Sequence, residues 1–91
     1  MRHHWFCYVV ECADGTLYTG ITTAPARRLA LHNRGVGARY TRGRGPVLLR
    51  LLEPYPDRSA ASRRERAIKA LPRTEKRRLV QDGRAKPCTH V

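Results

Sequence analysis

The alternation of apolar and polar residues along the chain predicts three strands and three helices. The segment from Trp5 to Cys12 is rich in aromatic and β-branched residues, which is typical of a strand, and Thr16 to Thr22 is expected to return beside it. Four further elements follow: a helix over 24–33, a strand over 47–52, and helices over 59–71 and 74–81. The order β-β-α-β-α-α predicts an α+β fold, with helices flanking a three-stranded antiparallel sheet.

The third strand and the two later helices carry distinct apolar patterns. The run Val47–Leu52 is almost continuously apolar, which predicts a position in the centre of the sheet, and Pro54 and Pro56 are expected to end it. Pro72 separates the two helices that follow, and Gly83 is expected to end the second of them. In the helix over 59–71, one stripe faces the core: Ala61, Ile68 and Leu71.

The helix over 24–33 combines an apolar side with two residues that can do chemistry. Thr23 is its expected N-cap, and Pro25 fits the first turn, where a missing N–H costs nothing. Arg28 and His32 lie four residues apart and therefore share a face of the helix. The residues expected to face the core are Ala26, Leu29 and Ala30.

The length of the turn at residues 13–15 decides which side chains share a face of the first hairpin. A two-residue turn would place Tyr8 and Tyr18 on opposite faces, because a slip of one residue moves every side chain to the other face. A three-residue turn with Gly15 in the left-handed region is predicted instead. It pairs Cys12 with Thr16, Val10 with Tyr18, and Tyr8 with Gly20.

The charge of the chain points to a polyanionic partner. The formal net charge is +12, and 16 of the 19 basic residues are arginine, whose planar fork suits phosphate. Nucleic acid is the first candidate and an anionic membrane surface the second. With 91 residues, no apolar run of about 18 residues and no signal-peptide pattern, a cytoplasmic protein of one domain is expected, with a core over about 5–82 and a loose C-terminal tail.

The three cysteines and the dispersed acids narrow the choice of metal site. No Cys-x-x-Cys pair is present, and the terminal group of His3, His4, Cys88 and His90 matches no usual zinc spacing, so neither disulfides nor structural zinc is predicted. The seven acidic residues form no cluster of the kind that two-metal nucleases need. A metal-dependent nuclease built on this chain would therefore hold its ion with a single carboxylate and water, which Mg²⁺ tolerates.

Several of these residues, taken in order, resemble the GIY-YIG nuclease superfamily. The resemblance covers residues 5 to about 80 and rests on Tyr8, on Tyr18-Thr19-Gly20, and then on Arg28, His32 and Glu65. Residues 38–43 (ARYTRG) and 63–71 (RRERAIKAL) resemble its small stand-alone, YhbQ-like branch, which is related to the nuclease domains of structure-specific endonucleases. The chain departs from the family in its first motif, where Phe6-Cys7-Tyr8 keeps only the tyrosine, and in having no candidate for a late asparagine.

The resemblance implies a role for each matched residue. Tyr8 would be the general base that activates water, and Tyr18 would position the water or the phosphate. A tyrosine with an ordinary pKa of about 10 is a poor base at neutral pH, so the site is expected to lower the pKa of Tyr8. Arg28 would neutralise the scissile phosphate, and His32 would relay a proton or hydrogen-bond a tyrosine. Glu65 would bind Mg²⁺, or Mn²⁺ in its place.

A second set of residues is expected to contact nucleic acid. Glycines in the basic loop over 35–46 let backbone N–H groups approach phosphates, and an aromatic ring there can stack on an unpaired base. The residues expected to bind are Arg39, Tyr40, Arg42, Arg44 and Lys69. For Lys76, Arg77 and Arg78 in the last helix, phosphate contact and a merely solvated surface remain equal alternatives.

Taken singly, each signal also has a structural explanation, such as cross-strand packing for the tyrosines or an i,i+4 surface pair for Glu65 and Lys69. Their joint order and spacing favours the resemblance, which implies a metal-dependent DNA endonuclease acting on branched, flap or nicked DNA in a process such as DNA repair. The alternative is a non-catalytic module of the same fold that binds DNA or RNA. A third option is a nuclease that needs a protein partner for specificity, and the oligomeric state stays open.

Overall fold

The structure is a computed structural model that describes residues 4–36 and 45–84. Its elements follow the order β-β-α-β-α-α, which confirms the predicted α+β fold with a three-stranded antiparallel sheet. The bounds are β1 Trp5–Glu11, β2 Leu17–Thr22, α1 Pro25–Asn33, β3 Leu48–Tyr55, α2 Arg58–Lys69 and α3 Arg73–Arg84. No helix in the described part of the chain is long and apolar enough to span a bilayer.

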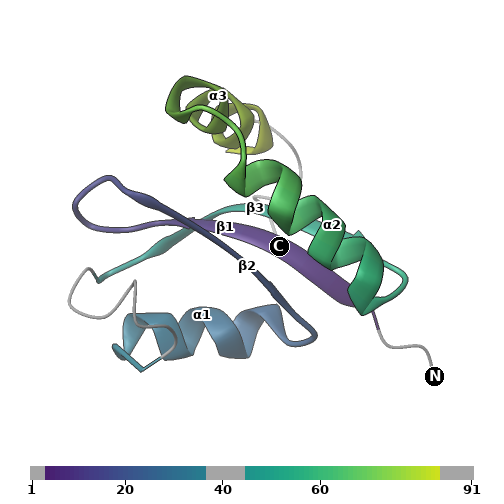
Figure 1. Ribbon diagram of the computed structural model, residues 1–91. Coiled ribbons are helices and arrows are strands. Elements are labelled where there is room, and N and C mark those ends of the chain that lie inside the picture. Colours follow the sequence, from purple (N-terminus) through teal and green to yellow (C-terminus); the bar gives the residue numbers. More distant parts are fainter. Residues whose placement is uncertain (1–3, 37–44, 85–91) are drawn as a thin grey trace.

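The sheet has the strand order β2-β1-β3, and helices cover both of its faces. Helix α1 lies against one face, and α2 and α3 lie against the other (Figure 1). On the α2–α3 face the core contains Cys7, Val9, Leu51, Ile68 and Val80, all of them buried. On the α1 face the buried residues are Tyr8, Val10, Cys12 and Val47. The two tyrosines thus belong to the layer between the sheet and α1.

The predicted central position of the third strand was wrong, because β1 is central and β3 is an edge strand. The strand is nonetheless apolar on both sides since helices cover both faces of the sheet, with Leu51 facing α2 and α3 and Leu52 facing α1. The strand also continues through Pro54 to Tyr55, which an edge strand tolerates because one of its sides has no hydrogen-bonded neighbour among the described residues.

The three-residue turn between β1 and β2 is confirmed. The Cys12 N–H donates to the Thr16 carbonyl at 2.8 Å, and Gly15 adopts a φ of +88°. The Asp14 carboxylate accepts from both the backbone N–H and the hydroxyl of Thr16, at 3.1 and 2.7 Å. Residues then pair as predicted, Val10 with Tyr18 and Tyr8 with Gly20. Both tyrosines therefore lie on the α1 face.

Helix α1 begins one residue later than predicted, and Thr23 is not its N-cap. Ala24 is the N-cap residue without a side-chain hydrogen bond, and its N–H instead donates to the Thr22 hydroxyl at 3.0 Å. The predicted core positions were partly wrong as well, because Ala26 and Ala30 are exposed. Leu29 does pack on the sheet, and the fully buried position of the helix is held by His32.

The two remaining helices confirm most of the predicted pattern. Asp57 caps α2 by accepting from the Ala60 N–H at 2.8 Å, and Ala61 and Ile68 are buried. Leu71, predicted to belong to the same stripe, lies beyond the end of α2 and is half-buried. Helix α3 runs through Gly83 rather than ending there, since one glycine near a helix end costs only about 1 kcal/mol.

Candidate active site

Tyr8 and His32 form a buried hydrogen-bonded pair between β1 and α1. The Tyr8 hydroxyl lies 2.9 Å from Nε2 of His32. The exposed fractions of the two side chains are 3% and 0%, so water does not compete for the bond. The predicted hydrogen bond between His32 and a tyrosine is thereby confirmed, and the tyrosine is Tyr8.

Tyr18 completes a cluster of three rings on the same face. Its ring centroid lies 6.4 Å from that of Tyr8 and 5.3 Å from that of His32, which it meets edge-on at 61°. The Tyr8 and His32 rings are 5.8 Å apart. Aromatic rings at such distances and tilts attract each other and hold one orientation. Tyr18 is half-buried, so it stands between the closed Tyr8–His32 pair and the solvent.

Gly20 makes room for the Tyr8 ring on edge strand β2. A Cβ atom at this position would lie 2.6 Å from the Tyr8 hydroxyl oxygen and 2.8 Å from Cζ. Any larger residue would therefore displace the ring from its present position. The sequence flagged Gly20 as part of a motif, but its packing role depends on the hairpin register.

Arg28 lies beside the pair, on the same side of α1. Hydrogen bonding and positive charge from Arg28 both act on the Tyr8 hydroxyl. Within the described part of the chain, its Nε atom is buried without a hydrogen-bond partner. The guanidinium also lines a cavity of about 240 Å³ together with Thr22, Thr23, Ala24, Arg27 and Leu31. A buried donor that lacks an acceptor, at the wall of a cavity with a second arginine, suits an anionic ligand.

Burial sets the protonation states of the pair. The pKa of Tyr8 is raised, chiefly by burial, and Arg28 opposes this rise only in part. The expectation that the site lowers the pKa of Tyr8 was wrong for the protein alone, because removal from water disfavours a phenolate. The pKa of His32 is lowered, first by burial and then by the charge of Arg28. A neutral phenol therefore faces a neutral imidazole, and in the tautomer with hydrogen on Nδ1 the Tyr8 hydroxyl donates to Nε2.

The lowered pKa of His32 predicts a pH dependence of stability. In the unfolded chain a histidine titrates near 6.5, whereas His32 in the folded protein takes up a proton only at lower pH. The free energy of unfolding should therefore be fully retained above pH 6.5 and fall as the pH drops toward the lowered pKa. Urea denaturation between pH 7.5 and 5.5 should show this loss in the wild type and a smaller one in His32→Gln. Equal pH slopes for the two proteins would contradict the assignment.

Glu65 approaches the cluster from the other side of the sheet. It lies on α2, which packs on β1 and β2, and its charge contributes to the raised pKa of Tyr8. Its half-buried carboxylate contacts the ammonium group of Lys69 at 3.1 Å. The structure thus gathers Tyr8, Tyr18, Arg28 and His32 into one contact group, with Glu65 coupled to it electrostatically.

Of the residues predicted to contact nucleic acid, only Lys69 lies in the part of the chain that the structure describes. Arg39, Tyr40, Arg42 and Arg44 lie outside the described residues. Lys69 is exposed apart from its pair with Glu65. Of the cysteines, Cys7 and Cys12 are buried free thiols, and Cys88 lies outside the described residues with His3 and His90.

Comparison with known proteins agrees with this geometry. Residues 4–78 match the family described as the GIY-YIG catalytic domain. The chain belongs to the GIY-YIG family. A UPF0213 protein of Desulfotalea psychrophila is 60% identical over 88% of this chain and 74% of its own, and UPF0213 protein YhbQ of Escherichia coli is 46% identical over 87% and 79%. The solution structure of a UPF0213 protein from Bacillus halodurans is 44% identical, with a TM-score of 0.56 over 86% of this chain and 83% of that one.

Membership of the GIY-YIG family means a nuclease-type fold, and the YhbQ-like resemblance is confirmed by these relatives. The fold positions the family's first tyrosine on central strand β1 even though the preceding residues are Phe6 and Cys7. Sequence reasoning missed Arg27, which lines the cavity beside Arg28. The adjacent pair of arginines in the first half of α1 was the available signal.

The residues of this GIY-YIG site fit a Mg²⁺ ion that would be held by one carboxylate, that of Glu65. Among residues 4–36 and 45–84, no group of three His, Cys, Asp or Glu side chains converges to hold a metal. Mg²⁺ keeps several waters and often binds through one carboxylate plus the phosphates of its substrate. The half-buried Glu65 carboxylate, whose charge reaches Tyr8, fits that mode of binding.

Proposed function

We propose that this protein is a divalent-metal-dependent DNA endonuclease that hydrolyses phosphodiester bonds in branched, flap or nicked DNA. The observation that carries the proposal is the buried hydrogen bond between Tyr8 and His32, with the cavity-lining guanidinium of Arg28 beside it. A phenol in contact with a neutral imidazole can pass a proton along a defined path. An arginine with an unsatisfied buried donor can bind the phosphate.

In this proposal Tyr8 takes a proton from the attacking water while its own hydroxyl proton moves to Nε2 of His32. The relay avoids a free phenolate, which the raised pKa of Tyr8 disfavours. The lowered pKa of His32 keeps the imidazole neutral and able to accept near neutral pH. Tyr18, half-buried and edge-on to His32, orients the water or a phosphate oxygen at the outer side of the pair.

Groups on both faces of the sheet would neutralise the negative charge of the scissile phosphate. Arg28 and Arg27 supply the donors at the α1 cavity. Glu65 would hold a Mg²⁺ or Mn²⁺ ion, which when bound would stabilise the departing oxygen. Lys69, already in contact with Glu65, adds positive charge at the same place.

Recognition of shape and phosphates, rather than base edges, fits the strong excess of arginine on this chain. The basic residues at 39, 42 and 44 and the aromatic residue at 40 are proposed to contact the unpaired or diverging strands. A protein partner is proposed to add further specificity.

The proposal is tested by cleavage of labelled flap, nicked, single-stranded and duplex DNA with Mg²⁺ or Mn²⁺. We expect cleavage of the flap or nicked substrates and its loss in excess EDTA. Tyr8→Phe should lower the single-turnover rate by about 10²-fold, at the lower end for a lost acid–base group because His32 remains in place.

Tyr55→Phe is the matched control for this substitution. Its hydroxyl also makes a half-buried hydrogen bond, to Glu53 at 2.9 Å, but on the α2–α3 face. Its rate should stay within about twofold of wild type. Tight DNA binding without cleavage of any substrate would instead identify a non-catalytic binding module.

A further inference from the structure

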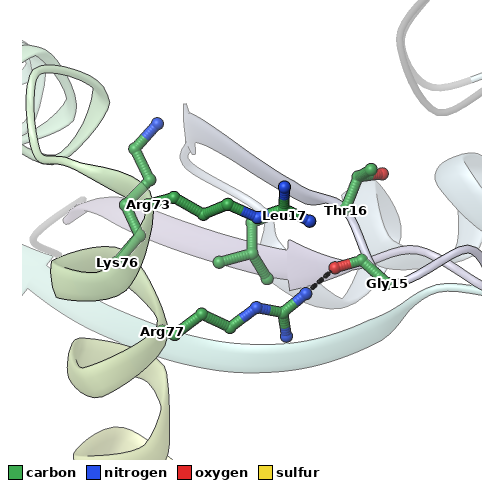
Figure 2. Close-up of a pocket in the computed structure, with 6 residues that line it drawn as sticks. All are labelled: Gly15, Thr16, Leu17, Arg73, Lys76 and Arg77. Atoms are coloured by element: carbon green, nitrogen blue, oxygen red, sulfur yellow. Dashed lines mark hydrogen bonds between the residues drawn. The ribbon is translucent and has the colours of Figure 1, made fainter.

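A second basic cavity lies on the face of the sheet opposite the Tyr8 site, between α3 and the β1–β2 turn. It has a volume of about 310 Å³ and is lined by Gly15, Thr16, Leu17, Arg73, Lys76 and Arg77. Figure 2 shows Arg73 and Arg77 reaching from α3 toward the turn, with Leu17 behind them. We refer to it as the α3 pocket.

One arginine of the α3 pocket is fixed in place. The Arg77 guanidinium contacts the Glu11 carboxylate at 3.0 Å and donates to the Gly15 carbonyl (Figure 2). Glu11 also accepts from Arg50 at 2.8 Å, and these two partners lower its pKa. A single carboxylate is thus shared by two arginines, so the charge of Arg77 is balanced only in part.

The other two cations of the pocket have no ion pair among the described residues. In the described part of α3, the ion pairs are those of Arg77 with Glu11 and of Arg78 with Glu75. Arg73 and Lys76 therefore add net positive charge around a concave surface whose apolar wall is Leu17. The Asp14 carboxylate at the turn accepts from the N–H and hydroxyl of Thr16 and keeps its negative charge, but Arg73, Lys76 and Arg77 outnumber the carboxylates of Asp14 and Glu11. Guanidinium and ammonium groups arranged in this way bind phosphate, and an apolar wall suits the sugar beside it.

The register of the hairpin relates this pocket to the candidate active site. Leu17 and Tyr18 are consecutive in β2, so their side chains point to opposite faces of the sheet. Because β2 is an edge strand, a chain of phosphates that passes around its edge can reach both faces.

We propose that the α3 pocket binds a backbone phosphate of the nucleic-acid substrate, on the other side of β2 from the phosphate that is cleaved. This inference rests on the proposed function for the identity of the ligand. Of the alternatives left open for Lys76, Arg77 and Arg78, it assigns phosphate contact to Lys76 and Arg77 and a solvated surface to Arg78, and it adds Arg73 to the phosphate contacts. Arg78 pairs with Glu75 at 3.9 Å, and its side chain is 73% exposed.

The test is DNA binding without cleavage, measured by fluorescence anisotropy of a labelled flap DNA in EDTA over a series of NaCl concentrations. Arg73→Ala should weaken binding about tenfold and reduce the slope of log K against log [salt] by about 1. Arg73→Lys should recover much of the affinity. Arg78→Ala, which removes the same charge from the same helix outside the pocket, is the matched control and should change binding less than about twofold.

Amide chemical shifts give an independent readout. Addition of the flap DNA should perturb the resonances of Gly15, Thr16 and Leu17 in the wild type, and much less in Arg73→Ala. Any of three results would overturn the proposal: equal effects of Arg73→Ala and Arg78→Ala on binding, unperturbed resonances of the turn residues, or a wild-type protein that binds no DNA. A selective effect of Arg73→Ala in a protein that binds but never cleaves would uphold the α3 pocket and refute the proposed endonuclease activity.

Discussion

Replacing Glu65 by glutamine should abolish cleavage, with a rate at least ~10³-fold below that of the wild type in Mg²⁺. The substitution keeps the shape and burial of the side chain but removes the negative charge that a divalent ion requires. The structure predicts little harm to the fold, because the partner of Glu65 is the exposed ammonium group of Lys69. Such an i,i+4 pair contributes only about 0.5 kcal/mol.

Single-turnover cleavage of flap DNA measures the effect, and urea denaturation verifies the fold. Glu75→Gln is the matched control, since Glu75 is also paired on a helix surface, with Arg78 at 3.9 Å, but lies on α3. It should cleave at nearly the wild-type rate. If Glu65→Gln retained more than about a tenth of the activity, Glu65 would not be the metal ligand. Tight DNA binding by the inactive variant would show that the loss is catalytic.

Gly20→Ala should abolish the proposed cleavage activity by displacing Tyr8. The new Cβ would lie 2.6 Å from the Tyr8 hydroxyl oxygen and 2.8 Å from Cζ, well inside contact distance. The ring is buried against His32 and Tyr18, so it cannot swing into solvent. We expect a loss of about 1–3 kcal/mol in the free energy of unfolding from overpacking. A displacement of the ring by about 1 Å should cost about 10²-fold in rate.

Gly35→Ala separates the effect on the site from the effect on stability. Gly35 has a φ of +81°, and no atom of the described residues would lie within 4 Å of a Cβ at this position. Its substitution therefore strains the backbone by about 1–2 kcal/mol without touching Tyr8. The two variants should lose comparable stability, and only Gly20→Ala should lose activity. Equal activities would show that the site adapts to the methyl group. In Gly20→Ala/Tyr8→Phe, removal of the closest atom should restore part of the stability and none of the activity.

The sequence predicted the part of the site that local rules control. Asp14-Gly15 allows a turn of two or three residues, and the three-residue turn, predicted because only its register places Tyr8 and Tyr18 on one face, is the one that forms. The spacing of Arg28 and His32 places both on one side of α1, where one is buried and the other lines a cavity. Periods of two residues in strands and of 3.6 in helices suffice for such predictions.

Features that depend on tertiary packing were not predictable from the chain. The continuous apolar run of β3 reflects helices on both faces of the sheet, and this signal is the same for a central and an edge strand. The raised pKa of Tyr8 depends on how completely α1 closes over it. Glu65 was assigned to the site by resemblance, and no rule of spacing shows that its charge reaches Tyr8 from the opposite layer of the molecule.

Loops between strands usually accept insertions and deletions more readily than the strands they join. The turn at residues 13–15 has no such freedom. Whether it has an odd or an even number of residues decides which side chains of β2 point to each face of the sheet. Deleting one residue would send Tyr18 into the aliphatic core under α2 and α3 and turn Leu17 toward His32. The hairpin would remain intact, but Tyr18 would leave the ring cluster and Leu17 would no longer form the wall of the α3 pocket. The number of residues in this turn thus acts as a functional element in its own right.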